Sequence, residues 1–448
     1  MRVPQKPPPT DADTLFGAGK LSRDLLEKVL AVDSALPDGR YLHWDELRYR
    51  QPPAGLSVQQ WWAGISHRRS HEAQAIHAMR QTYSVPFRFV ALAHIQRQLH
   101  DFDRVNVGSA ILSAMGNPDA KIEYRVRQLI EEAISSSEIE GARPTTRELA
   151  RQMLRERRPP ASRDEKMILN NLRAMERLGE LHRTQTALTV DHLLELHRIL
   201  GEGALEVEGA EGEFRTSAHA VEVSDMEGNV WHVPPPAEGL PERMERLLAF
   251  ANGQDDGQPG FIHPIIRAIV THFWLGYEHP FRDGNGRIAR ALYYWCMLRE
   301  GYEVAEFLSI SGPIDRNPKA YYKAFAHSEA DDGDLTYFVL HQLEVMRSAL
   351  DELLEHLRQR ASRLRALAQV VKSYEELNHR QRSLLEHAIR HPNQGHTIAG
   401  YATSYAVHYL TARTDLADLE RRDLLHSRRV HKLKRYYPSS KLMNSRPE

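Results

Sequence analysis

The sequence predicts a mainly α-helical protein, and three observations support that fold class. Apolar residues recur at helical spacing over most of the chain from Lys121 onward, as in residues 188–200. Two segments, 263–281 and 287–298, are apolar on nearly every face, which is typical of helices at the centre of an all-helical domain. Extended patterns are few, and the clear one in the middle of the chain predicts a β-hairpin over residues 214–235.

Charge and cysteine content narrow the class of protein. Lys and Arg number 59 against 60 Asp and Glu, so the overall charge gives no argument for nucleic acid or a membrane as partner. Cys296 is the single cysteine, which excludes an intramolecular disulfide and is typical of a reducing compartment. The start of the chain lacks a secretory apolar segment, and no stretch approaches the ~18 apolar residues of a membrane span. We therefore expect a cytoplasmic protein with no membrane contact.

Changes of pattern along the 448 residues predict four parts. Residues 1–110 form an N-terminal lobe with a disordered, proline-rich start, followed by an irregular connector and helices. Residues 111–350 form the central helical domain, which includes an amphipathic helix over 121–141. Residues 351–375 are expected to be a linker helix, and residues 376–440 a separate C-terminal domain.

The C-terminal domain has the pattern of a winged helix-turn-helix. A first helix is followed by a small-residue helix from Thr397, a third helix and a basic end. Residues 421–441 hold eight Lys or Arg against Asp423 alone, and clustered cations are what contact with DNA phosphates requires. The same surface would equally dock a protein, so DNA, a protein partner and a homodimer all stay open.

The string HPFRDGNGRIAR, residues 279–290, lies between the two buried helices. Gly284 and Gly286 allow positive φ and a close approach of the backbone to a ligand, and the amides that start the next helix attract an anion. Arg287 and Arg290 are three residues apart on one helix face, so both reach a polyphosphate lying across that helix end.

Two further residues complete the chemistry of this string. Asp283 places a carboxylate where a hard divalent ion between phosphates needs one. His279 carries the side chain whose reference pKa suits a general base near neutral pH. A glycine turn followed by arginines is often only a turn with solvated charge, but the whole set in this order favours a catalytic site. This set of residues predicts that the site binds a nucleoside polyphosphate with Mg²⁺ and deprotonates a hydroxyl group.

The same string resembles the signature of the Fic family, His-x-Phe-x-(Asp/Glu)-Gly-Asn-Gly-Arg-x-x-Arg, and meets every fixed position. The resemblance extends from about Ile122 to Leu350 and implies a Fic-type helical core with a β-hairpin flap. Family members usually transfer AMP from ATP to Ser, Thr or Tyr of a protein and release pyrophosphate. The resemblance therefore implies a protein adenylyltransferase that uses ATP and Mg²⁺ on a hydroxyl-bearing protein target, or on itself.

The resemblance also implies a role for each position of the string. His279 is the base that activates the target hydroxyl, Asp283 holds Mg²⁺, and Phe281 anchors the loop in the core. The phosphates are bound by an anion hole and two arginines, namely Gly284, Asn285, Gly286, Arg287 and Arg290.

Residues outside the string are expected to complete the pocket. Val230, Trp231 and His232 of the hairpin would line the nucleotide or target side, and the exposed hairpin edge would pair with a target segment. Tyr321 and Tyr322 match family tyrosines at the adenine pocket, where a ring stacks on the base. A plain surface hairpin and two core aromatics are the simpler interpretations of these same residues.

A second short motif precedes the catalytic string. Ser136, Glu140 and Gly141 match the family's inhibitory motif, (Ser/Thr)-x-x-x-Glu-(Gly/Asn). We expect Glu140 in the last turn of the helix over 121–141, where the helix dipole disfavours an anion and a cation partner is needed. The resemblance implies pairing with Arg290, which blocks the γ-phosphate. Some members use this glutamate to orient water and reverse the modification, and the sequence does not separate the two directions.

Functions from two classes therefore remain. The first is an enzyme, either a protein adenylyltransferase restrained by Glu140 or a de-AMPylating hydrolase. The second is a DNA-binding transcriptional regulator whose central domain only senses nucleotide. His279 favours the enzyme, because a sensor has no need of a catalytic base.

Overall fold

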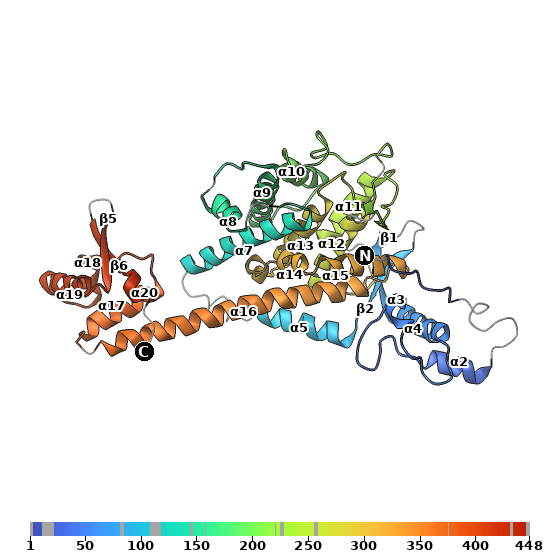
Figure 1. The fold of residues 1–448 in the computed structure, drawn as a ribbon, viewed down its shortest axis with the longest axis horizontal. Helices are drawn as coiled ribbons and strands as arrows, with labels where there is room; N and C mark the ends of the chain where they lie inside the picture. The colour runs from blue at the N-terminus through green and yellow to red at the C-terminus, as the bar shows by residue number, and fades with distance from the viewer. Residues whose placement is uncertain are drawn as a thin grey trace. The chain divides into compact units, whose positions relative to one another are not determined.

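The computed structural model of the chain divides into two compact units. Unit 1 comprises Met1–Gly108 and Arg125–Leu350, and unit 2 comprises Ser109–Tyr124 and Asp351–Glu448. The structure describes residues 3–10, 22–80, 85–107, 118–143, 147–156, 158–219, 221–224, 228–254, 259–374, 376–430 and 433–444. The mainly helical class is confirmed (Figure 1). Residues 3–10 of the expected disordered start are described and lie in neither a helix nor a strand, whereas the rest of it lies outside the described residues. The disorder and the four-part division stay predictions.

The first part of unit 1 mixes short helices with a hairpin. Its elements are α2 Arg23–Leu30, α3 Trp44–Leu47, α4 Val58–Glu72, β1 Ala73–Arg80, β2 Pro86–Val90 and α5 Ala93–Val107. The sequence predicts only an irregular connector and helices here, whereas β1 and β2 form an antiparallel pair. Phe87 and Phe89 alternate with the less buried Arg88, which is the period of a half-buried strand.

The central part of the chain is a succession of helices with one small hairpin. Its elements are α7 Pro118–Ile139, α8 Arg147–Glu156, α9 Arg163–Arg183, α10 Val190–Gly201, β3 Val223–Ser224, β4 Val230–His232, α11 Leu240–Ala251, α12 Pro264–Glu278, α13 Asn285–Arg299, the 3₁₀ helix η1 Glu303–Phe307, α14 Ser311–Arg316, α15 Pro318–Ala330 and α16 Thr336–Ser373. α16 is one continuous helix, so the expected linker over 351–375 is its second half and has no break before it.

Helices α12 and α13 pack against each other at the centre of unit 1 (Figure 1). Phe273, Trp274 and Trp295 are at most 2% exposed, so both helices are buried on nearly all faces as predicted. Helices α9 and α10 contact α13, and α11 contacts α12. The loop between α12 and α13 is therefore held at both ends by core helices, which suits a site that needs fixed geometry.

The described part of unit 2 after α16 contains three helices, a hairpin and a short last helix. They are α17 His379–Arg390, α18 Ile398–Ser404, α19 Tyr409–Arg421, β5 Leu425–Val430, β6 Leu433–Pro438 and α20 Ser440–Asn444. Leu385, Leu416 and Tyr436 belong to a separate core that joins these elements. Across the described ranges of both units, no helix combines the length and the apolar character needed to cross a bilayer.

Candidate active site

His279 closes helix α12 and faces a cavity of about 400 Å³. Its backbone has φ 45°, an uncommon conformation for a residue with a side chain, and strain of this kind gathers at functional sites. Its Nδ1 lies 3.1 Å from the carbonyl oxygen of Gly276, so Nδ1 carries the hydrogen and donates it. Nε2 is then the proton-accepting nitrogen. Burial lowers the pKa of His279 to about 4, so the imidazole is neutral near pH 7.

The loop after His279 is closed by a side chain of the string itself. Asn285 Oδ1 accepts from the amide of Phe281 at 2.9 Å, and Asn285 Nδ2 donates to the carbonyl of the same residue at 2.9 Å. Phe281 is fully buried, in agreement with its expected anchoring role. The side chain of Asn285 therefore shapes the loop, and only its backbone amide is left for an anion.

His197 of α10 supports the loop through contacts to Asp283 and Phe281, and it was not predicted from the sequence. The amide of Gly212 donates to its Nδ1 at 2.9 Å, so Nε2 carries the hydrogen and donates to the carbonyl of Asp283 at 2.9 Å. Its ring stacks on Phe281 with centroids 3.7 Å apart. Burial lowers the pKa of His197 to about 4, so this donor arrangement persists at neutral pH. The signal in the sequence was a histidine within an amphipathic helix.

The amino end of α13 offers an anion site beside His279. Gly284 caps the helix with φ 83°, and the first helical bond runs from the amide of Ile288 to the carbonyl of Gly284 at 3.2 Å. The amides of the first turn have no partner within the helix, and the helix dipole adds positive character there. A Cβ at Gly286 would lie 2.1 Å from Glu140 Oε1, so only glycine fits where this carboxylate rests against the helix end.

Glu140 follows helix α7 directly. The helix ends at Ile139, so the expectation that Glu140 lies in its last turn is wrong by one residue. The amide of Ala142 donates to the carbonyl of Ser137 at 3.0 Å, and Gly141 has φ 95°, which together make the Schellman end of a helix. Among the described residues other than its two chain neighbours, no atom lies within 4 Å of a Cβ placed on Gly141, so its φ is the reason for glycine there. This turn brings Glu140 toward α13.

Arg290 is the partner of Glu140, as the family resemblance implies. Its Nη2 lies 2.8 Å from Glu140 Oε1, and its Nε donates to Ser136 Oγ at 2.9 Å. Arg290 is 1% exposed. Burial disfavours its charged form, but Glu140, Tyr321 and Glu132 together outweigh burial, and the pKa of Arg290 is raised. Removing Glu140 would leave the buried charge of Arg290 without its ion-pair partner.

Arg287 lies deeper than the sequence predicts. It is 1% exposed and is not among the residues that line the cavity. Its Nη2 lies 3.6 Å from Asp283 Oδ1, and burial lowers the pKa of Arg287. Within the described residues, Arg287 Nε and Nη2 and Arg290 Nη1 have no hydrogen-bond partner. Buried donors are rarely left unpaired, so these three groups favour an anionic ligand nearby.

Asp283 lies at the edge of the cavity and has the chemistry of a Mg²⁺ ligand. Its side chain is 22% exposed. Oδ1 accepts from the amide of Gly284 at 2.5 Å, and Oδ2 accepts from the amide of Glu206 at 2.9 Å. These bonds orient the carboxylate, and each oxygen keeps a lone pair for a hard cation. Among the described residues, no group of three or more His, Cys, Asp or Glu could form a complete metal site by itself. Mg²⁺ held with a polyphosphate does not need one.

The hairpin β3–β4 forms one wall of the cavity. Trp231 and His232 line it, whereas Val230 is 38% exposed and does not. His232 is held between two elements: its Nε2 lies 2.7 Å from the carbonyl of Tyr277, and its Nδ1 lies 2.7 Å from Glu329 Oε2. Of the three flap residues predicted to line the site, the structure places two there.

Two adjacent tyrosines of α15 line the cavity on another side. Tyr321 is 3% exposed, and its hydroxyl lies 2.8 Å from Nε2 of the buried His272. Tyr322 is 36% exposed. Tyr321 is therefore part of the packed wall, and Tyr322 is the ring with more free surface for a nucleotide base.

The structure brings most of the predicted residues to one cavity. Those that line it are Glu140, Trp231, His232, His279, Asp283, Gly286, Arg290, Tyr321 and Tyr322. Ser136, Gly284 and Arg287 contact residues of this set, Asn285 holds the backbone of Phe281 in the same loop, and Gly141 shapes the turn that carries Glu140. A neutral imidazole, an open helix end and a carboxylate around one cavity define an acid–base site for an anionic substrate.

Comparison with known proteins shows what the part of the chain around the string 279–290 is similar to. Residues 187–297 match the model of the Fic/DOC family, so the chain contains a Fic domain. A protein adenylyltransferase Fic of Nematostella vectensis is 37% identical over 116 residues, which are 26% of this chain and 24% of that protein. A protein adenylyltransferase Fic of Drosophila grimshawi is 31% identical over 164 residues, which are 37% of this chain and 30% of that protein. The chain thus spans less than a third of the length of these two relatives.

A solved structure supports the fold. The structure of a Fic family protein from Desulfovibrio desulfuricans G20 is similar with a TM-score of 0.50 at 20% identity, over 78% of this chain and 95% of that one. The Fic-type helical fold predicted from the sequence is thereby confirmed.

Proposed function

We propose that the chain is a protein adenylyltransferase that transfers AMP from ATP to a Ser, Thr or Tyr hydroxyl of a protein and is restrained by Glu140. One observation carries this proposal. The proton-accepting Nε2 of His279 shares a cavity with the amino end of α13, where buried donors of Arg287 and Arg290 lack partners among the described residues. The relatives named protein adenylyltransferase support the same reaction.

The reaction uses the chain's residues mainly to position groups and to move one proton. The target hydroxyl oxygen bonds to the α-phosphorus of ATP, the bond from that phosphorus to the β-phosphate oxygen breaks, and pyrophosphate leaves. His279 Nε2 takes the hydroxyl proton, while Gly276 keeps the ring in the required tautomer. The first-turn amides of α13 and the arginines behind them stabilise phosphate charge, which is the larger part of catalysis in such transfers.

Mg²⁺ would be held by Asp283. When bound with ATP, the ion neutralises charge shared between phosphates. Asp283 presents an oriented carboxylate to the cavity, and the carbonyl of the same residue accepts from His197. His197 thus holds the backbone of Asp283, and Asn285 holds the loop that follows the base.

Glu140 competes with the outer phosphates for the same place. Its carboxylate rests against Gly286 and pairs with Arg290, so the helix end already holds a negative charge. A triphosphate entering the cavity must displace this charge or bind in a non-productive position. The restraint is therefore electrostatic as well as steric.

The pH dependence of the reaction should reflect the lowered pKa of His279. A base acts in its unprotonated form, and with a pKa of about 4 the ring of His279 stays unprotonated throughout the neutral range. In an active Glu140→Gly protein, kcat/KM for ATP should therefore be flat from neutral pH down to about pH 5 and fall below it. An acidic limb centred near the reference value of about 6.5 would contradict this assignment. Circular dichroism at each pH separates loss of the base from unfolding.

Contact with duplex DNA through unit 2 is a second candidate function. The order α17, α18, α19, β5, β6 is typical of a winged helix, in which the hairpin is the wing. Arg428 and Arg429 lie exposed on β5. Three cations of the basic run are, however, already paired: Asp418 pairs with Arg421 and Arg422, and Glu420 pairs with Lys434.

A salt titration of the full chain on duplex DNA tests this second function. Binding should weaken as salt rises, and the Arg428→Ala, Arg429→Ala double variant should reduce the slope of log K against log salt by about 1 to 2. If the full chain has no affinity for DNA even at low salt, the regulator hypothesis is wrong. Unit 2 would then be left as a surface for protein targets or for a second copy.

A further inference from the structure

A polar seam joins the inhibitory helix α7 to helix α13. Three residues spaced four apart meet residues four apart on α13, in antiparallel order. Glu132 and Ser136 of α7 contact Tyr294 and Arg290, and Glu140, one residue after the end of α7, rests against Gly286. Residues at this spacing share one face of a helix. The Glu140–Arg290 pair is therefore one end of a longer seam, and Glu132 is at the other end.

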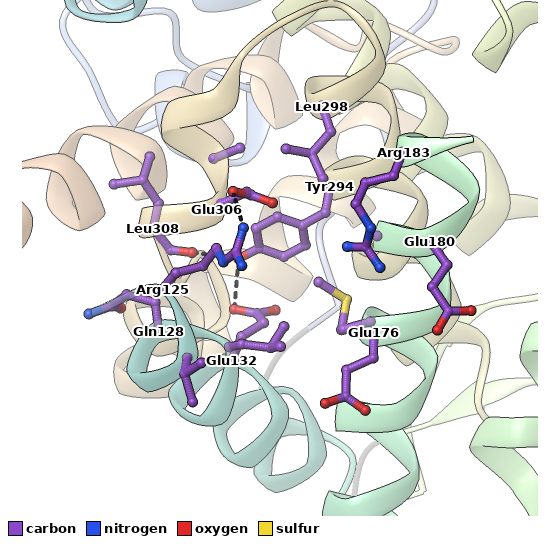
Figure 2. Close-up of a pocket in the computed structure, with 15 residues that line it drawn as sticks. Arg125, Gln128, Glu132, Glu176, Glu180, Arg183, Tyr294, Leu298, Glu306 and Leu308 are labelled. Carbon is purple, nitrogen blue, oxygen red and sulfur yellow. Dashed lines mark hydrogen bonds and ion pairs between the residues drawn. The ribbon is translucent and has the colours of Figure 1, made fainter. Parts of the chain in front are cut away.

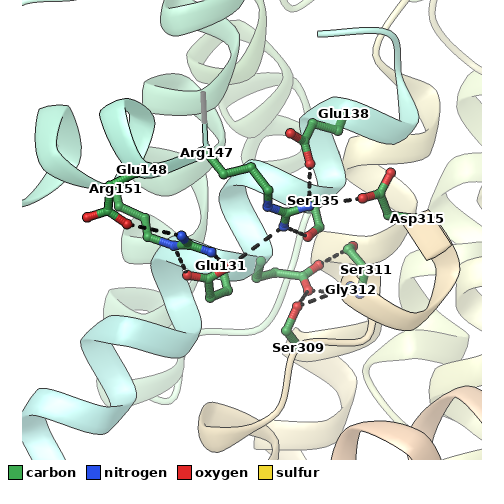
Figure 3. Close-up of polar contacts among 11 residues, drawn as sticks. Glu131, Ser135, Glu138, Arg147, Glu148, Arg151, Ser309, Ser311, Gly312 and Asp315 are labelled. Atoms are coloured by element: carbon green, nitrogen blue, oxygen red, sulfur yellow. Dashed lines mark hydrogen bonds and ion pairs between the residues drawn. The ribbon is translucent and has the colours of Figure 1, made fainter. Parts of the chain in front are cut away.

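Glu132 is a buried carboxylate with a full set of donors. It is 2% exposed. Its Oε2 accepts from the hydroxyl of Tyr294 at 2.8 Å, from Ser309 Oγ at 2.8 Å and from the amide of Ser311 at 3.0 Å, and its Oε1 accepts from Ser311 Oγ at 2.5 Å. Figure 3 shows Ser309 and Ser311 together at the start of α14. Hydrogen bonds to a buried charge are strong and directional, so they fix where α7 lies along its axis.

The apolar contacts of α7 do not fix this position equally well. Ile130 and Ile134 pack with residues of α8 and α9 in one small cluster, and apolar contacts have little directionality. A cavity of about 430 Å³ separates the first part of α7 from α9. In Figure 2, Arg125, Gln128 and Glu132 border this cavity from α7. Packing around Glu132 is therefore incomplete on the side of α9.

A second polar cluster lies on a more exposed side of α7. Arg147 of α8 donates to Glu138 at 2.6 Å, to Ser135 Oγ at 2.6 Å and to Asp315 at 3.1 Å (Figure 3). The side chain of Arg147 is 37% exposed, so solvent screens these contacts. The buried Glu132 is the stronger of the two attachments.

We propose that Glu132 is a positioning residue that sets the register of α7 and so brings Glu140 to Arg290. A shift of α7 by one residue is about 1.5 Å along the axis, which is enough to break a 2.8 Å contact between Glu140 and Arg290. Tyr294 lies four residues after Arg290 on α13, and its hydroxyl gives Glu132 a fixed donor on the same helix as Arg290. This inference rests on the proposed function, because the inhibition that it positions is part of it.

Two variants test the inference without altering the nucleotide site. Tyr294→Phe removes the hydroxyl donor at nearly constant side-chain volume. Glu132→Gln replaces the carboxylate that accepts all four hydrogen bonds by a neutral amide. Each should raise AMP transfer about ten-fold, since a hydrogen bond to a charged group is strong enough to shift a two-state equilibrium by that factor. In the Glu140→Gly background, neither change should raise the rate of AMP transfer further, because the inhibitory carboxylate that α7 positions is already absent.

Glu131→Gln is the matched control on the same helix. Glu131 is the neighbouring residue, and it bonds to Arg151 at 2.5 and 3.0 Å outside the seam. This variant should keep the restrained rate, and melting temperatures of all variants report any general loss of stability. Equal activation by Glu131→Gln would show mere loosening of α7 and overturn the inference.

The remaining outcomes are also decisive. If Glu140→Gly is active while folded Tyr294→Phe and Glu132→Gln both stay at the restrained rate, the inference is wrong and the proposed function stands. If Glu140→Gly shows no transfer, the proposed function fails first. If Glu132→Gln does not fold, Tyr294→Phe still gives the answer. A further rise in the Glu140→Gly background would assign the seam to catalysis and contradict the inference.

Discussion

Replacing Glu140 by glycine is expected to raise the rate of AMP transfer by about a hundredfold. This factor corresponds to a free energy of roughly 2.7 kcal/mol, which is the cost we assign to competition by Glu140 for the phosphate site. The variant removes the carboxylate that rests against Gly286 and pairs with Arg290, and it frees a buried guanidinium for the outer phosphates. Incorporation of label from ATP labelled at the α-phosphorus measures the effect, on the chain itself and on added proteins.

Glu156→Gly is the control for this variant. Glu156 is also a glutamate at the end of a helix, α8, but it is exposed and contacts only Gln152 among the bonds described. It should leave labelling at the wild-type level. Unchanged labelling after Glu140→Gly would contradict the inhibitory role. If the same substitution instead abolished release of AMP from a modified protein, Glu140 would serve the reverse reaction.

Replacing His279 by alanine in the Glu140→Gly protein should lower transfer by roughly a thousandfold, within the range that a general base contributes. The ring supplies the acceptor for the hydroxyl proton. Among the described residues that line the cavity, no other imidazole has a nitrogen without a partner beside the start of α13. Binding of ATP with Mg²⁺, measured by titration calorimetry, should stay within about threefold, because the phosphate donors are unchanged.

A histidine on another helix controls for this substitution. His182→Ala, in the last turn of α9, changes a partly exposed histidine outside the cavity and should have no effect on transfer. If His279→Ala retained most of the activity, the proton would be taken by water or by the substrate, and the assigned base would be wrong. A parallel loss of ATP binding would indicate collapse of the loop instead.

The sequence predicts the site well where the chemistry is local. The string from His279 to Arg290 is continuous, and the structure places its base, carboxylate and glycine turn around one cavity. The buried helices on either side, α12 and α13, were predictable from their apolar character. Glu140 and Arg290 are 150 residues apart, and their pairing was predictable only through the resemblance to a known family.

Features that depend on distant contacts were not predictable. His197 belongs to another helix, and only the fold brings it under Asp283. The depth of Arg287 follows from the packing of α10 on α13, which spacing along one helix does not report. Glu132 and Tyr294 each continue a visible spacing of four residues, but their pairing needs the antiparallel alignment of α7 and α13.

Intact mass spectrometry of the Glu140→Gly protein after incubation with ATP and Mg²⁺ shows whether AMP is transferred to a hydroxyl group. We expect a covalent gain of one AMP on a hydroxyl side chain, absent when His279 is also replaced. A gain of phosphate alone would contradict AMP transfer. So would an unmodified mass, if the protein binds ATP and does not label added hydroxyl-bearing proteins either.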